Sequence, residues 1–323
     1  MSILAPSRAP SVSVLDFGII APGRDGASVL RDSLELADAA ERLGYNTFWV
    51  AEHHEAHFAW GAPAIVMAAL GQRTTRIRIG SAAVLLPLYN PLQVAETFRT
   101  LAALYPSRIY LGVCAGVPED AIALAALSDS DFCAQPDSFA QKLPALEAFL
   151  HGRFEAGHRF AFGATPQHAM APALWVMGSS ERAARRAGAN RAHFAYSLFH
   201  RGSAQEPSVA RAFREACSAR GDGFEGRVQI AATCICAETE IAAQAQRKRV
   251  EHWLQNDLKV VISGTKQQCH EQIVDLVDRF DADDVTLFHL WHEQAPRLAA
   301  LGAIADAFKL NTYAPARDNN HAP

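Results

Sequence analysis

The sequence predicts an α/β protein of the (β/α)8 barrel class, also called a TIM barrel. Strand-like and helix-like segments alternate along almost the whole chain of 323 residues, and they form eight strand–helix units. Repeated strand–helix–strand connections make the strands parallel and place the helices outside, and eight such units close naturally into a barrel. An open doubly wound sheet is the alternative, but the first turn, 21–26, does not fit the Gly-x-Gly-x-x-Gly pattern that often opens such sheets.

Each predicted helix depends on apolar residues that recur at helical spacing. In segment 27–43, Leu30 and Leu34 lie on one face, and Gly44 ends the helix. Segment 91–104 carries proline in its first turn, where a helix tolerates it. We expect helices at residues 27–43, 62–72, 91–104, 139–150, 180–189, 208–220, 238–256, 266–280 and 295–308.

Each predicted strand is a short apolar or alternating run. Segment 47–51 is an apolar run of strand length, whereas Arg78 alternates with Ile77 and Ile79 in the third strand. We expect strands at residues 12–20, 47–51, 77–83, 109–114, 173–177, 193–196, 229–236 and 285–289. The stretch 115–172 is less regular, so we expect an irregular insertion after strand four, with one helix inside it.

The composition is that of an ordinary globular protein, with 50% hydrophobic and 20% charged residues. The net charge of −4 argues against nucleic acid or an anionic membrane as the main partner. No apolar run reaches the ~18 residues that span a bilayer. The six cysteines show no paired Cys-x-x-Cys spacing, which favours reduced thiols and a cytoplasmic location.

The domain organisation follows from these patterns. We expect one barrel domain over residues 11–310, because barrels of about 250 residues or more commonly form a single unit. The flanking segments 1–10 and 311–323 are short, contain proline and lack a long apolar core, so we expect both to be disordered.

The triplet Glu52-His53-His54 directly follows the second predicted strand. Side chains at the carboxyl ends of parallel strands line the site of a barrel enzyme, and histidine can exchange a proton near neutral pH. His57 adds a third imidazole, but the metal-binding patterns His-Glu-x-x-His and His-x-His are missing from the places where metal barrels carry them. We therefore expect proton transfer and no metal.

Two further segments fall at the same end of the predicted barrel. Gly178-Ser179-Ser180 joins the fifth strand directly to a helix, whose free N–H groups and positive dipole end attract an anion such as phosphate. The alternative is that the serines only cap that helix. The small residues 80–83 allow a flat ligand to approach the backbone, or they serve only close packing.

Several long blocks then decide the resemblance. They are AERLGY at 40–45, FWVAEHH at 48–54, RIRIGSAAVLLP at 76–87, NPLQVAE at 90–96, PSRI at 106–109, WVMGSS at 175–180 and GT at 264–265. With these blocks in this order, the chain resembles the bacterial luciferase-like, flavin-dependent monooxygenases over nearly all of 14–308.

The resemblance implies a barrel that binds reduced FMN (FMNH2), supplied by a separate flavin reductase. The reduced flavin and O2 give a C4a-peroxyflavin, which oxygenates an organic small molecule, here expected in secondary metabolism. The resemblance implies acid–base chemistry at His53, within the catalytic triplet of Glu52, His53 and His54. It also implies flavin contacts at Ala82 and Ala83, which a cis peptide bond joins, and at Cys114, Val176, Met177, Gly178, Ser179 and Ser180.

Two positions depart from the family pattern. Ala115 stands where an arginine commonly holds the flavin phosphate, and Ala183 stands where serine or threonine is usual. They motivate an alternative, a non-catalytic luciferase-like barrel with weakened flavin binding. A further alternative is an oxidoreductase that uses the deazaflavin F420.

The resemblance also implies a homodimer that pairs through the helices beside strands two and three. The segment 62–70 is rich in small and apolar residues, which agrees with this expectation. Six residues of the variable loops are expected to wall a partly aromatic substrate pocket: His57, Phe58, Trp60, Tyr89, Phe199 and Trp291.

Overall fold

Eight parallel strands form the closed barrel that the sequence predicts. The computed structural model describes residues 10–118, 120–128, 138–167, 170–200, 203, 205–253 and 258–311. The barrel strands are β1 (Ser11–Asp16), β2 (Thr47–Val50), β3 (Arg78–Ser81), β5 (Ile109–Cys114), β6 (Ala173–Gly178), β7 (His193–Ser197), β8 (Val228–Ala237) and β10 (Asp284–His289). The ring closes because β10 pairs with both β1 and β8. The ends predicted to be disordered lie outside the described residues, except for residues 10 and 311.

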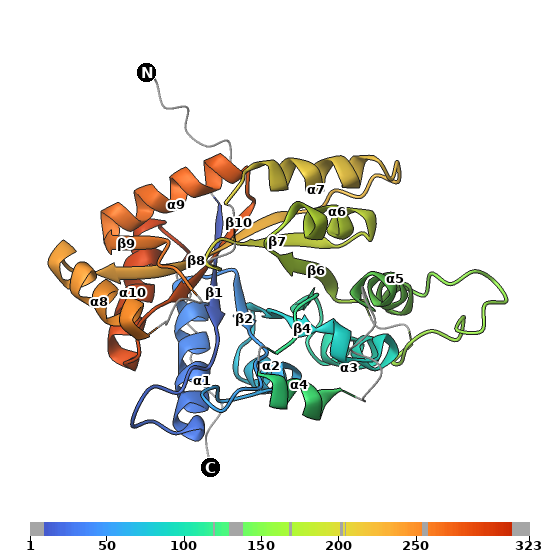
Figure 1. The fold of residues 1–323 in the computed structure, drawn as a ribbon, viewed down its shortest axis with the longest axis horizontal. Helices are drawn as coiled ribbons and strands as arrows, with labels where there is room; N and C mark the ends of the chain where they lie inside the picture. Colours follow the sequence, from blue (N-terminus) through green and yellow to red (C-terminus); the bar gives the residue numbers. More distant parts are fainter. Residues whose placement is uncertain are drawn as a thin grey trace, which may run out of the picture.

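Helices surround the barrel (Figure 1). They are α1 (Gly26–Leu43), α2 (Pro63–Arg73), α3 (Pro91–Leu104), α6 (Glu181–Ala189), α7 (Ser208–Ser218), α8 (Glu240–Trp253), α9 (Lys266–Phe280) and α10 (Gln294–Ala307). The predicted bounds of these helices agree to within two residues, and those of α3 and α9 agree at both ends. Residues 254–256 of the helix predicted at 238–256 lie outside the described residues. Local capping explains the agreement: Gly44 ends α1 with a φ of 87°, and the Asn90 side chain accepts the Leu92 N–H at the start of α3. Within the described part of the chain, no helix has the length and hydropathy needed to cross a bilayer.

The structure adds short elements that the patterns do not predict. β4 (Val84–Leu85) pairs with β5, and β9 (Ile262–Thr265) pairs with the end of β8. The insertion after β5 contains α4 (Ala121–Leu127) besides the predicted helix, which is α5 (Ser138–His151). The 3-10 helix η1 (Leu86–Leu88) follows β4. These elements were missed because two to seven residues are too few to establish a period.

The first strand is shorter than predicted and ends at Asp16. Gly18 has a φ of 67°, and a Cβ there would lie 2.5 Å from the ring of Trp60. The chain therefore turns away where the indole packs against the backbone, although the apolar run continues to Ile20.

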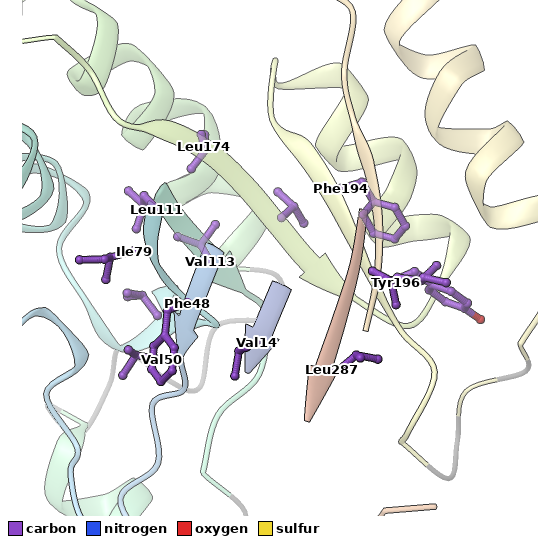
Figure 2. Close-up of a cluster of buried hydrophobic side chains, with 14 of the residues drawn as sticks. Val14, Phe48, Val50, Ile79, Leu111, Val113, Leu174, Phe194, Tyr196 and Leu287 are labelled. Carbon is purple, nitrogen blue, oxygen red and sulfur yellow. The ribbon is translucent and has the colours of Figure 1, made fainter. Parts of the chain in front are cut away.

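The outward faces of the strands build the larger core, between the barrel and the helices. Figure 2 shows this layer, with Val14, Phe48, Leu111, Phe194 and Leu287 among its buried side chains. Each of these side chains is fully buried, which is typical of parallel strands that are covered on both faces.

Aromatic side chains fill the middle of the barrel. Trp49 and Trp175 meet edge to face, with ring centroids 5.7 Å apart, and Tyr110 packs against both. A Cβ on Gly80 would lie 2.3 Å from Trp49, so only glycine leaves room for this ring. These aromatic side chains therefore fill the barrel interior below the carboxyl ends of the strands.

Candidate active site

The predicted site residues gather at the carboxyl ends of four successive strands, β2, β3, β5 and β6. The Ala82 N–H donates to the Val50 carbonyl over 2.7 Å, which ties the end of β3 to the end of β2. Leu85 of β4 pairs with Cys114, and Val113 pairs with Val176 of β6. The register therefore places the triplet, the alanine pair, Cys114 and the segment 177–180 along one rim.

Glu52 is the anchor of this rim. Its buried carboxylate accepts hydrogen bonds from the Tyr89 hydroxyl at 2.7 Å and from the Leu85 N–H at 3.3 Å. The His54 Nε2 lies 2.9 Å from the same carboxylate. The sequence assigns Glu52 and His54 to catalysis, but the structure pairs them with each other. Together their hydrogen bonds hold the loop after β2 in one conformation.

His53 has a different environment. Its ring stacks on Phe58 with centroids 4.1 Å apart, and Phe17 packs on it at 5.1 Å. Its Nδ1 lies 3.9 Å from the Glu55 carboxylate, and 33% of the side chain is exposed. Burial lowers the pKa of His53 from 6.5 to about 4, so the imidazole is neutral near pH 7. A neutral, partly accessible imidazole can accept a proton.

The same burial raises the pKa values of two neighbouring groups, Glu52 and Cys114. Burial raises the pKa of Glu52, although Tyr89 and His54 oppose this shift through their hydrogen bonds. Burial and, to a smaller extent, the nearby Glu52 carboxylate raise the pKa of the Cys114 thiol to about 11. Cys114 is therefore a neutral thiol and not a nucleophilic thiolate at neutral pH.

A cis peptide bond joins Ala82 and Ala83, as the resemblance implies. Ala82 is half-buried and packs against the interior cluster, and so does Met177 of β6. The side chains of Ala82 and Met177 are only partly buried, so part of their apolar surface stays accessible at the rim. Val176 differs, because its side chain is fully buried in the outer core and offers nothing to the rim.

The start of α6 forms the far end of the rim. The Ser180 side chain accepts the Ala183 N–H over 3.3 Å, so this serine caps the helix. A Cβ on Gly178 would lie 2.6 Å from the Cβ of Ala183, so the helix approaches the strand closely here. Capping and anion binding are compatible, because the other N–H groups of the first turn have no partner within the helix.

The six residues expected to wall a substrate pocket do not all lie together. Phe58 and Tyr89 contact His53 and Glu52, and Phe199 packs edge to face on Phe17. Trp60 instead belongs to the core: it is 8% exposed, and its Nε1 donates to the Ala51 carbonyl over 2.8 Å. His57 is exposed and contacts Phe58, whereas Trp291 lines a separate cavity beside β10.

Phe17 is the main residue that the sequence analysis missed. It follows β1 and packs on His53, Phe199 and Phe288. Its place after a strand end was the available signal, but an apolar residue there reads as part of the strand. Among the described residues, no group of three or more histidine, cysteine or acidic side chains is arranged to hold a metal ion.

Comparison with known proteins gives a family match over most of the chain. Residues 13–272 match the family described as luciferase-like monooxygenase. The chain belongs to the luciferase-like monooxygenase family. Its relatives include the N-acetyl-S-alkylcysteine monooxygenase of Bacillus subtilis, with 29% identity over 86% of this chain and 92% of the relative. The protein YwcH of the same organism is 29% identical over 92% of this chain and 99% of its own.

Solved structures share the fold. The apo structure of MsnO8 has 30% sequence identity and a TM-score of 0.82, and the match covers 94% of this chain and 100% of MsnO8. The oxygenating constituent of 3,6-diketocamphane monooxygenase from Pseudomonas putida, in complex with FMN, has 17% identity and a TM-score of 0.71 over 93% and 98% of the chains. An F420-dependent secondary alcohol dehydrogenase has 16% identity and a TM-score of 0.67 over 93% and 99%. The last two likenesses concern the fold alone.

Proposed function

We propose that this protein is an FMN-dependent monooxygenase of the cytoplasm. It takes reduced FMN from a separate flavin reductase, uses O2 as co-substrate and oxygenates an organic small molecule in secondary metabolism. The observation that carries the proposal is the single rim on which a neutral histidine, an apolar shelf and a helix N-terminus meet.

The rim has the chemistry that a flavin mononucleotide needs. The open surfaces of Ala82 and Met177 form an apolar shelf that would lie against a flat ring. The start of α6, at Gly178, Ser179 and Ser180, would hold the phosphate through backbone N–H groups and the helix dipole. When bound there, the reduced flavin would supply the electrons that activate O2.

His53 is the residue that we assign to proton transfer. Its pKa of about 4 leaves a lone pair free at neutral pH, and Phe17 and Phe58 fix the plane of its ring. Phe199 and Phe288 extend this aromatic cluster and exclude water from the same corner.

Glu52 and His54 act on His53 indirectly. The Glu52 carboxylate binds Tyr89, the Leu85 backbone and His54, so it fastens the loop that carries His53 to β4 and η1. We assign Glu52, His54 and Tyr89 to positioning.

Reconstitution with a flavin reductase tests the proposal. The reductase, NADH, FMN and heavy-isotope O2 are combined with a panel of thioethers, ketones and phenols. One labelled oxygen atom should appear in a product, and less hydrogen peroxide should be released when that substrate is present. Reduced FMN that fails to bind at micromolar concentration would remove the proposal.

The competing function is a non-catalytic barrel with weakened flavin affinity. Ala115 is exposed and presents no cation, and Ala183 lies against Gly178 where the family usually carries a hydroxyl. Fluorescence titration with FMN and FMNH2 separates the two functions, because tight binding counts against the non-catalytic one. Parallel titration with F420 tests the deazaflavin alternative.

We also propose a homodimer that forms through α2 and α3. Ile65 on α2 is 73% exposed and Leu104 on α3 is 61% exposed, although both are large apolar residues. Light scattering at micromolar concentration should give the mass of a dimer, and Ile65→Lys should shift it toward the monomer because a buried, unpaired charge is costly. Ile241→Lys on α8, where the isoleucine is 80% exposed, is the matched control.

A further inference from the structure

A cavity separate from the rim lies between the barrel wall and its helices, beside the ends of β1 and β10. It measures about 40 Å³ and is lined by Asp16 of β1, His289 of β10, Arg24 before α1 and Arg297 of α10. At roughly 10–15 Å³ for each water, it has room for about three waters or one molecule of a few heavy atoms. The Arg24 side chain is 31% exposed and His289 is 1% exposed, so the cavity extends from the surface to the buried layer.

His289 is the innermost polar group of this cavity. Neither of its ring nitrogens has a hydrogen-bond partner among the described residues. Burial and, to a smaller extent, the nearby Arg297 lower the pKa of His289 to about 3, so the ring is neutral and offers one N–H and one lone pair. Buried polar atoms are nearly always hydrogen-bonded, so an imidazole in this position indicates a missing partner.

Two more buried donors line the cavity without a partner among the described residues. They are the Nε1–H of Trp291 and the Nε–H of Arg297. The Asp16 carboxylate makes its hydrogen bonds elsewhere: it accepts from Arg297 Nη2 at 2.8 Å, Ser33 Oγ at 2.6 Å and the Gly18 N–H at 3.1 Å. The described residues thus provide no acceptor for these two donors.

The charges around the cavity are balanced before any ligand binds. Arg24 pairs with Asp32 at 2.7 Å, and Arg297 pairs with Asp16. The first turn of α10 also lies here, and the side chain of its N-cap residue, Glu293, makes no capping hydrogen bond. The positive end of that helix dipole adds to the surplus of donors, so a negatively charged acceptor fits the site.

We propose that this cavity is a binding site for a small carboxylate of the size of formate or acetate. One carboxylate oxygen would accept from His289 and the other from both Trp291 and Arg297. The site would adjoin the aromatic cluster of the rim, because Phe288 lines the cavity and stacks on Phe17 at 4.4 Å, and Phe17 packs on His53.

Nuclear magnetic resonance of protein labelled at the histidine ring nitrogens tests the proposal. Acetate is the probe, acetamide is its neutral counterpart of equal size, and His289→Gln assigns the His289 signals by deleting them. Acetate should shift the His289 signals in a saturable way. Trp291→Phe keeps an aromatic ring but removes the indole N–H donor, and it should weaken acetate binding about tenfold.

The control is His270→Gln on α9, a histidine that contacts Phe308 and does not line the cavity. It should bind acetate as the wild type does. The proposal is wrong if acetate produces no saturable shift of His289, if Trp291→Phe binds acetate unchanged, or if acetamide binds as tightly as acetate. None of these readouts depends on FMN, so the site is tested independently of the proposed monooxygenase activity.

Discussion

His53 lies shortly after the end of β2, and His289 is the last residue of β10. Burial keeps both imidazoles neutral, yet their surroundings differ. His53 is one-third exposed at the rim, and two phenyl rings hold it. His289 is 1% exposed, faces the helix layer and has no partner among the described residues. A lowered pKa therefore does not by itself identify a catalytic histidine. Access to the reacting groups and the orientation of the ring separate the two roles.

The largest expected effect separates the two histidines by activity. His53→Ala should reduce the rate of substrate oxygenation by ~10²- to 10⁴-fold, the usual contribution of a general acid or base, while FMN affinity stays nearly unchanged. Steady-state product formation and FMN titration measure the two effects. His158→Ala, which removes an exposed imidazole from the insertion, is the control. Full activity of His53→Ala would show that His53 does not transfer a proton in the reaction.

The second prediction concerns pH and stability. The unfolded chain protonates His289 near pH 6.5, whereas the folded chain does so only near pH 3, because the ring is buried and lies near the positive charge of Arg297. The unfolded state thus binds more protons in this window, and stability falls as the pH falls. His289→Gln should make the decrease shallower by up to ~1.4 kcal/mol per pH unit. Urea unfolding at several pH values between about 7 and 5 measures this slope. An unchanged slope would mean that His289 does not titrate as the buried group that we describe.

The third prediction compares two glycines, Gly178 at the end of β6 and Gly302 on α10. At Gly178 on the rim, an added methyl group would lie 2.6 Å from Ala183 and push α6 away. Gly178→Ala should destabilise the fold by ~1–3 kcal/mol and weaken FMN binding. Gly302→Ala on α10 has no atom within 4 Å of the added group and should stabilise the helix by up to ~1 kcal/mol. If both variants bind FMN equally well, the start of α6 is not the phosphate site.

The smallest expected effect tests the hydrogen bonds by which Glu52 holds the loop after β2. Tyr89→Phe removes the 2.7 Å hydrogen bond but leaves the bonds from Leu85 and His54. We expect a loss of about 1–2 kcal/mol of stability. The oxygenation rate should decrease by a few fold with an unchanged pH profile, because the variant displaces His53 without changing its chemistry. A pH profile that shifts with Tyr89→Phe would instead assign the hydroxyl to proton transfer.

Short elements and unusual packing mark the limit of prediction from the sequence. The boundaries of α3 and α9 were predictable because Asn90-Pro91 and the Thr265 cap are local signals. β9 and α4 were missed because four and seven residues do not define a period, although the Asp120 side chain caps α4. Trp60 was expected at the pocket and lies in the core, because the turn at Gly18 was not visible in the apolar pattern.

The sequence by itself determined the barrel and the rim. Alternating periodicity sets parallel strands, and parallel strands bring residues after each strand end to one face whatever the loops do. Only the tertiary structure decided which of these residues cooperate. The contact of Tyr89 with Glu52, the packing of Phe17 between β10 and His53, and the cavity at His289 join segments far apart in the chain. Such contacts depend on side-chain packing across the closed barrel, which no local pattern encodes.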